Sequence, residues 1–234
     1  MKKKTLLKIL TIVISLVVLI AVIYPLIPTI KNISTAEGRM FFRDEIQNLG
    51  IKGAIYLFVL QAVQMIFVVL PGEPIEVLYG MCYGSVWGAV LLTVSVFINT
   101  VIVYKIVQLF GRKILVFFFS ESKIQKIEQS KLLKNSKKVE KIIILLFFLP
   151  GTPKDLLLYL GALLPIEKKK FILISTFVRF PSVITSTIAG DNIVSGKLYI
   201  SIAIYIVTAV ILFFILKKSN KTDEETSKFV EAIK

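Results

Sequence analysis

The stretch that decides the fold is VVLPGEPIE, residues 68–76, and it has a near-copy in FFLPGTPKD, residues 147–155. In each stretch an apolar run meets Leu-Pro-Gly-x-Pro, and ionisable residues follow directly. Proline and glycine are the two residues that most disfavour the interior of a helix. The motif therefore predicts that two apolar helical segments are broken in the same way at two points of the chain.

The composition indicates a membrane protein that crosses the bilayer several times. Of the 234 residues, 56% are hydrophobic, whereas soluble domains average roughly 45–50%. The chain has 29 Lys and Arg against 15 Asp and Glu, a formal charge of +14. These bases lie between the apolar runs, where they orient a membrane protein and face anionic headgroups. This placement argues against a nucleic-acid partner.

Several kinds of chemistry are excluded by composition. The chain has no His and one Cys, Cys82, which excludes imidazole ligation, an intramolecular disulfide and a thiolate cluster. We find no nucleophile–base pair and no metal-ligand set in the sequence. We therefore expect a protein that is not an enzyme and has no metal and no cofactor.

Apolar stretches of about 20 residues are long enough to cross the hydrocarbon. The sequence predicts full spans at 6–28, 86–104, 171–190 and 198–216, and interrupted stretches at 53–84 and 141–164. The first span follows a basic start, as a signal peptide does. Because it is longer than the usual 7–15 apolar residues of a signal, we interpret it as a retained membrane anchor.

The basic linker 111–141 decides between two topologies. It holds nine bases and three acids, so its net charge is 9 − 3 = +6. If both interrupted stretches crossed fully, the linker would lie outside, against the positive-inside rule. If each enters and leaves on one side, four spans remain and the linker lies inside, with Lys168–Lys170 and Lys217–Lys218. We therefore expect both termini in the cytoplasm, one hairpin entering from outside and the other from inside.

The two halves resemble each other beyond the Pro-Gly motif. Ser95, Phe97 and Asn99 follow the first motif as Ser175, Phe177 and Arg179 follow the second. Related units that enter from opposite faces form an inverted-topology repeat, which is typical of secondary transporters. The expected fold is an all-α integral membrane protein, an inverted repeat of re-entrant helical hairpin plus transmembrane helix with about four full spans.

This fold predicts a division of the chain. The expected parts are an N-terminal transmembrane anchor and outer loop (1–52), a repeat domain (53–200), a last transmembrane helix (198–216) and a cytoplasmic tail (217–234). The repeat domain comprises hairpin 53–84, span 86–110, cytoplasmic linker 111–140, hairpin 141–164 and span 171–190. The linker is either a helix in the inner interface, with Ile124 and Ile127 on one side, or a solvated connector.

The residues after each Pro-Gly permit two interpretations. As caps, Glu73 and Thr152 would precede a helix whose first residue is proline, with Glu76 and Asp155 third. A helix that begins inside a membrane also directs free N–H groups at a cavity. There Lys154, Gly151 and Thr152 are candidates for binding phosphate, and Glu73, Glu76 and Asp155 for carrying protons. The tips themselves would be formed by Pro71, Gly72, Pro74, Pro150 and Pro153.

Arg179 is the strongest single candidate because it lies near the centre of a predicted span. An arginine at that depth faces the protein interior and finds a partner, here Asp155 or Glu76. It forms either a structural ion pair or a fork for phosphate. Pro181 predicts a kink close by. Secondary candidates are Asn99, at the matching place in the first repeat, and Arg112, whose default role is anchoring at the inner surface.

Four blocks resemble the VTT-domain (SNARE-associated) membrane proteins of the DedA superfamily over about residues 50–200: LPGEPIEVLYGMCYGSVWG, FGRK, LPGTPKDLLLYLGAL and FVRFPSVITSTIAGD. The resemblance implies an inner-membrane protein with paired re-entrant hairpins that moves undecaprenyl phosphate or phospholipids between leaflets, coupled to protons. It maps the essential groups to Glu73 or Glu76, Asp155 and Arg179. Relatives often carry an arginine before the second Pro-Gly, where this chain has Phe147 and Phe148.

These expectations combine into one function with two alternatives. We expect a flippase- or scramblase-type lipid transporter of the cytoplasmic membrane, whose partners are anionic phospholipid or undecaprenyl phosphate and protons. The alternatives are a proton-coupled small-solute or ion transporter and a non-transporting membrane scaffold.

Overall fold

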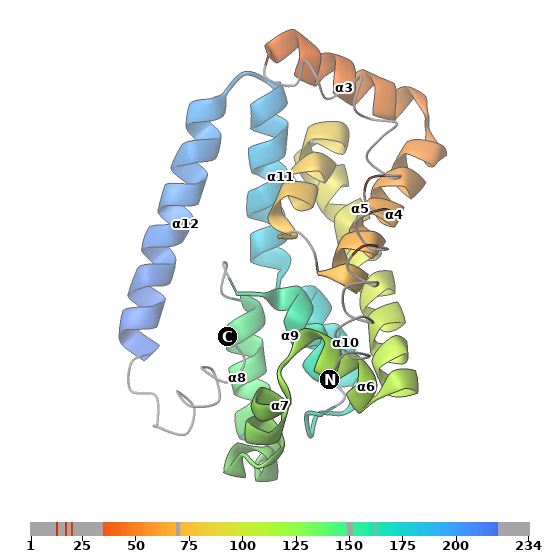
Figure 1. The fold of residues 1–234 in the computed structure, drawn as a ribbon. Helices are drawn as coiled ribbons and strands as arrows, with labels where there is room; N and C mark the ends of the chain where they lie inside the picture. The colour runs from red at the N-terminus through yellow and green to blue at the C-terminus, as the bar shows by residue number, and fades with distance from the viewer. Residues whose placement is uncertain are drawn as a thin grey trace. The chain divides into compact units, whose positions relative to one another are not determined.

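The computed structural model describes residues 35–68, 71–148, 152–161 and 163–219, with Val13, Val17 and Ile20 before them (Figure 1). Every regular element in these residues is a helix, which confirms the all-α class for this part. The helices group into two compact units. The first comprises the described residues up to Val96 together with Val183–Ile206, and the second comprises Phe97–Ser182 with the described residues from Val207.

The predicted spans are confirmed in part. Within the described residues, Glu73–Phe110 and Lys168–Val194 are long and apolar enough to cross a membrane. They contain the predicted spans 86–104 and 171–190. Span 6–28 lies outside the described residues apart from three positions, and the apolar segment Leu198–Thr208 of the last helix is shorter than a full crossing. The four-span arrangement and the inverted repeat therefore remain predictions.

The first unit begins with two helices that meet at a sharp bend. Helix α3 (Ala36–Asn48) is capped by Thr35, whose hydroxyl accepts from the Gly38 amide at 3.0 Å. Helix α4 (Ile51–Phe67) follows at 107° to it. If the bent pair is one span, the number of candidate spans in the described residues rises from two to three.

The first Pro-Gly motif breaks the helix as predicted. Helix α4 ends before Val68, which has a left-handed backbone (φ 50°). The chain becomes helical again at α5 (Glu73–Phe110), where the Gly72 carbonyl accepts from the amides of Ile75 and Glu76. The cap is thus Gly72, one residue before the predicted Glu73. A second interruption lies at Gly84 (φ 76°, ψ 179°), at the predicted end of hairpin 53–84.

Backbone-to-backbone contact joins the start of α5 to α11 (Phe180–Val194) in the first unit. The α-carbon of Gly80 faces the backbone of Thr187, and that of Gly190 faces the carbonyl of Val77. Around this contact the unit's core is built from α3, α4, α5 and α11, with the buried residues Phe42, Ile46, Leu57, Leu60, Ile75, Tyr79 and Val183. Helix α12 (Leu198–Ser219) begins in the same unit.

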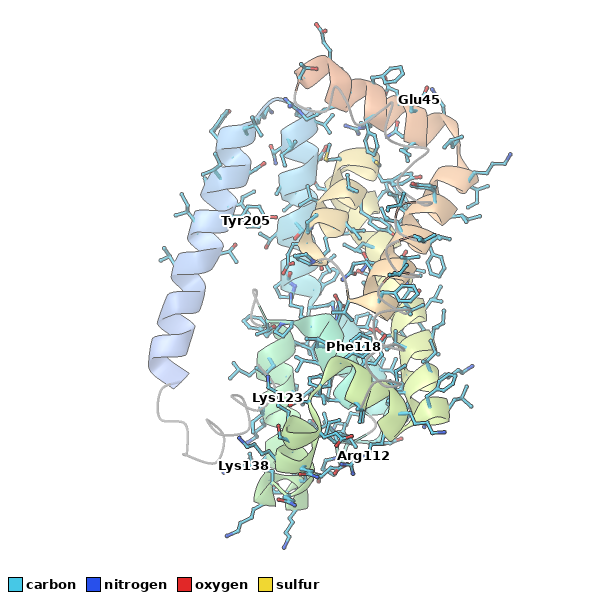
Figure 2. The ribbon with its side chains drawn as sticks, viewed as in Figure 1. Glu45, Arg112, Phe118, Lys123, Lys138 and Tyr205 are labelled. Carbon is cyan, nitrogen blue, oxygen red and sulfur yellow. The ribbon has the colours of Figure 1, made fainter. Side chains whose placement is uncertain are left out.

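The linker of the second unit is folded. It forms α6 (Arg112–Phe118), α7 (Glu121–Glu128) and a 3₁₀ turn, η2 (Lys131–Lys134). Ile124 and Ile127 are fully buried in the protein, so the apolar side of α7 is covered by neighbouring elements of the chain. The basic side chains of this region lie mostly at its surface; Figure 2 labels Arg112, Lys123 and Lys138 there.

The rest of the second unit surrounds the second Pro-Gly motif. Helix α8 (Ser136–Phe148) leads into the motif, and α9 (Lys154–Leu160) and α10 (Lys168–Phe177) follow it. Between α10 and α11 the chain leaves the helical pattern at residues 178–179. Because Pro181 lacks an N–H group, it cannot bond to the carbonyl four residues earlier. The predicted kink is therefore confirmed as a break just before Pro181.

Candidate functional site

The guanidinium of Arg179 is buried beside an acid, as predicted. Arg179 is 2% exposed, and the break between α10 and α11 lets its side chain turn back along α10. Its Nε donates to the Ser175 carbonyl at 2.9 Å, and its Nη1 lies 3.5 Å from Oδ1 of Asp155. Of the two predicted partners, the structure thus shows Asp155. A charge-assisted bond is usually 2.7–2.9 Å long, so this ion pair is loose.

One nitrogen of this guanidinium has no hydrogen-bond partner among the described residues. Nη2 is buried and donates to no protein atom in that part of the chain. The Cζ atom lies 5.4 Å from the ring centre of Phe147 on α8, a distance typical of cation–π contact. The aromatic ring stabilises the charge without using its N–H groups, so a donor stays available for an oxygen acceptor.

Lys154 adds a second positive charge to the same part of the unit. Lys154 and Asp155 are the first residues of α9, and both are buried. Together with Arg179 they place two cationic side chains and one carboxylate in the buried part of the second unit.

The predicted cap by Thr152 is wrong. Its hydroxyl donates to the Leu146 carbonyl at 2.6 Å, which ties the loop to the end of α8. The cap position of α9 is occupied by Pro153, and Lys154 is the first helical residue. The reason is that α9 begins one residue later than predicted, so the cap position falls on Pro153, whose side chain has no acceptor for the helix amides. The other predicted residues of this tip, Pro150 and Gly151, lie outside the described residues.

The acids of the first motif belong to the other unit. Glu76 is buried near the start of α5, and Glu73 is half-buried. Pro71 and Pro74 are exposed at this tip and Gly72 is half-buried. The structure thus pairs Arg179 with Asp155 in the second unit and places Lys154 beside Asp155 at the start of α9, whereas Glu73 and Glu76 belong to the first unit.

The two secondary candidates differ. Arg112 is exposed at the start of α6, and its Nη1 pairs with Glu128 at 3.1 Å. This agrees with anchoring as its default role. Asn99 is fully buried in α5, and neither atom of its amide has a hydrogen-bond partner among the described residues. A buried amide without partners is unusual in proteins.

A polar cluster around Asp191 in the first unit was not predicted from the sequence. Oδ2 of Asp191 accepts from the amide and hydroxyl of Ser85 at 3.1 and 2.7 Å, and Oδ1 lies 3.7 Å from Arg43. Arg39, one turn before Arg43 on α3, donates to the Ile193 carbonyl at 2.9 Å. The cluster fixes α3 and the end of α11 to the interruption at Gly84. The arginines at i and i+4 on α3 were a signal for it.

Replacing Asp191 with alanine is expected to lower the free energy of unfolding by about 1–3 kcal/mol, because the Ser85 amide loses its acceptor where α5 restarts. The half-exposed pair with Arg43 contributes little of this. Thermal unfolding of the purified protein measures the effect. Asp44→Ala is the matched control, since Asp44 is exposed on the same helix as Arg43. An equal effect of both changes would contradict the assigned role of Asp191.

The comparisons with known proteins agree with this architecture. A family model described as the VTT domain matches residues 70–192, which is more than half of the chain and contains both Pro-Gly motifs, Arg179 and Asp191. No curated protein and no solved structure matches the chain.

Proposed function

Since the chain belongs to the VTT domain family of membrane proteins, we propose that it is a flippase- or scramblase-type lipid transporter of the cytoplasmic membrane. Its cargo is a phosphate-bearing lipid, such as undecaprenyl phosphate or a phospholipid, which it moves between leaflets with coupling to protons. The observation that carries this proposal is the buried Arg179, held loosely by Asp155 at 3.5 Å and with Nη2 unpartnered among the described residues.

A phosphate group suits this arrangement because it presents several strong acceptor oxygens to a planar fork of donors. Nη2 of Arg179 would donate to one oxygen, and the ammonium of Lys154 adds a second positive charge. The loose contact with Asp155 leaves Nη1 able to turn toward the same ligand.

Asp155 provides a means of coupling to protons. Asp155 contacts the guanidinium that would bind the anion, so arrival of the anion and the Arg179–Asp155 contact compete for the same Nη1 donor. The buried Glu76 and the half-buried Glu73 are the proposed proton carriers of the first unit.

Reconstitution in liposomes tests the function. We expect labelled undecaprenyl phosphate or labelled phospholipid to exchange between leaflets faster than in empty vesicles, with a rate that depends on an imposed pH gradient. Arg179→Lys should slow the exchange, whereas Arg112→Lys, at an exposed ion pair, should leave it unchanged. Flux of a small solute without lipid exchange would instead support a solute transporter, and the absence of any flux would support a scaffold.

A further inference from the structure

Four polar side chains are buried where α5 and α10 pack against each other in the second unit. Asn99 and Thr100 come from α5, and Ser175 and Thr176 come from α10; all four are 0–1% exposed. We call these four residues the α5–α10 polar layer. The neighbouring contact is aromatic, because the rings of Tyr104 and Phe171 lie 5.8 Å apart. A polar layer beside an aromatic contact needs an explanation.

The two helices are antiparallel at this contact. Tyr104 of α5 meets the first turn of α10, since its ring also lies 5.6 Å from Nζ of Lys168. On the side of α5 that carries Tyr104, the preceding residues Asn99, Thr100 and Val103 are buried, whereas Leu109 and Phe110 at the end of the helix are exposed. The end of α5 therefore extends past the start of α10, and the earlier turns of α5 lie along the later turns of α10. Figure 1 shows α10 beside the yellow-green part of α5.

The register of the pair places the polar side chains opposite each other. Thr100 lies four residues before Tyr104, and Ser175 lies four residues after Phe171. Residues four apart share one face of a helix, and four residues rise about 6 Å. Counting from the aromatic contact, Thr100 thus faces Ser175. Asn99 and Thr176 are their next neighbours in sequence, so they lie at the same level of the helix pair.

These side chains do not satisfy each other's hydrogen bonds. The Ser175 hydroxyl donates to the Ile172 carbonyl at 3.1 Å. The amide nitrogen and oxygen of Asn99 and the hydroxyls of Thr100 and Thr176 have no partner among the described residues. Buried polar atoms nearly always have a partner, either in the protein or in an ordered water. Buried water typically binds two to four such atoms.

We propose that the α5–α10 polar layer holds a buried cluster of water molecules. The amide of Asn99 donates to and accepts from this water, and the hydroxyls of Thr100 and Thr176 complete its coordination. Arg179 lies one helical turn beyond Ser175, and its Nη2 also lacks an acceptor among the described residues. The water cluster therefore ends next to the guanidinium, where an entering anion can displace its last member.

Radiolytic hydroxyl labelling of the full-length protein in detergent detects such water directly, because radicals formed from bound water oxidise the side chains that touch it. Phe171 and Phe42 are both 0% exposed, but only Phe171 borders the layer. We expect Phe171 to be oxidised several-fold faster than Phe42, with oxygen taken from labelled water. Equal, slow oxidation of both would show that the layer is dry and would overturn the proposal.

A second measurement uses the isosteric double variant Thr100→Val/Thr176→Val. If water is bound, the valines remove two of its partners, and the unfolding temperature falls. If the hydroxyls are buried dry, their removal relieves an unpaired group and leaves the unfolding temperature unchanged or higher, which contradicts the proposal. The matched control is Thr187→Val, whose fully buried hydroxyl donates to Ile184 within α11 at 3.1 Å. Neither measurement depends on lipid transport.

Discussion

Arg179→Ala is expected to lower the free energy of unfolding by about 3–5 kcal/mol, the usual cost of leaving one partner of a buried ion pair without the other. The side chains of Arg179 and Asp155 are only 3% and 11% exposed, so solvent screens the remaining carboxylate poorly. The variant also loses the bond to the Ser175 carbonyl and the contact with Phe147. Unfolding of the purified protein in detergent measures the loss.

Two controls separate the ion pair from other effects of the substitution. Adding Asp155→Asn to Arg179→Ala removes the uncompensated charge, so part of the lost stability should return. Arg112→Ala breaks an exposed pair with Glu128 and should cost no more than about 1 kcal/mol. Equal costs for Arg179→Ala and Arg112→Ala would show that the buried pair does not contribute as the structure indicates.

Arg179→Lys separates stability from ligand binding. Lysine keeps the positive charge beside Asp155 but cannot offer a planar fork to two oxygens. If the proposed function is right, the variant stays folded while lipid exchange slows by roughly tenfold to a hundredfold. This slowing corresponds to the loss of one hydrogen bond to a charged group, which contributes about 1.5–3 kcal/mol. Unchanged exchange in a folded Arg179→Lys protein would remove the guanidinium from the proposed site.

The features that sequence analysis predicted correctly are those with a local cause. The breaks at the two Pro-Gly motifs and before Pro181 follow from the missing N–H group of proline and the flexibility of glycine. The burial of Arg179 follows from the cost of exposing an arginine to lipid, and the partner was one of two acids considered. Each of these inferences needs only the residue and its immediate surroundings in the sequence.

The features that were missed depend on contacts between distant residues. Asp191 lies 106 residues from Ser85, its hydrogen-bond partner, and no local pattern connects them. Thr152 was expected to cap α9 because the sequence shows which residue precedes a helix. It does not show that α9 begins one residue later, with Pro153 at the cap position and the Thr152 hydroxyl donating to the Leu146 carbonyl of α8.

The contact between α5 and α11 in the first unit also joins residues that are far apart in the sequence. A substitution that disturbs this contact should have a second large effect on stability. Gly190→Val is expected to prevent normal packing of this unit, at a cost above the roughly 1–3 kcal/mol usual for overpacking. A β-carbon on Gly190 would collide with the Val77 carbonyl and the Met81 amide. Both are backbone atoms of a helix and cannot move aside as a flexible side chain does. We expect little folded protein on size-exclusion chromatography.

A glycine with open space around it is the control for this backbone contact. Gly196 has φ +73° and no atom within 4 Å of a β-carbon placed on it. Asparagine tolerates this left-handed conformation better than other residues, so Gly196→Asn should fold with nearly normal stability. The smaller change Gly190→Ala should already destabilise the protein, because the clash involves the first side-chain carbon. A well-folded Gly190→Val protein would show that α5 and α11 do not approach as closely as the two glycines indicate.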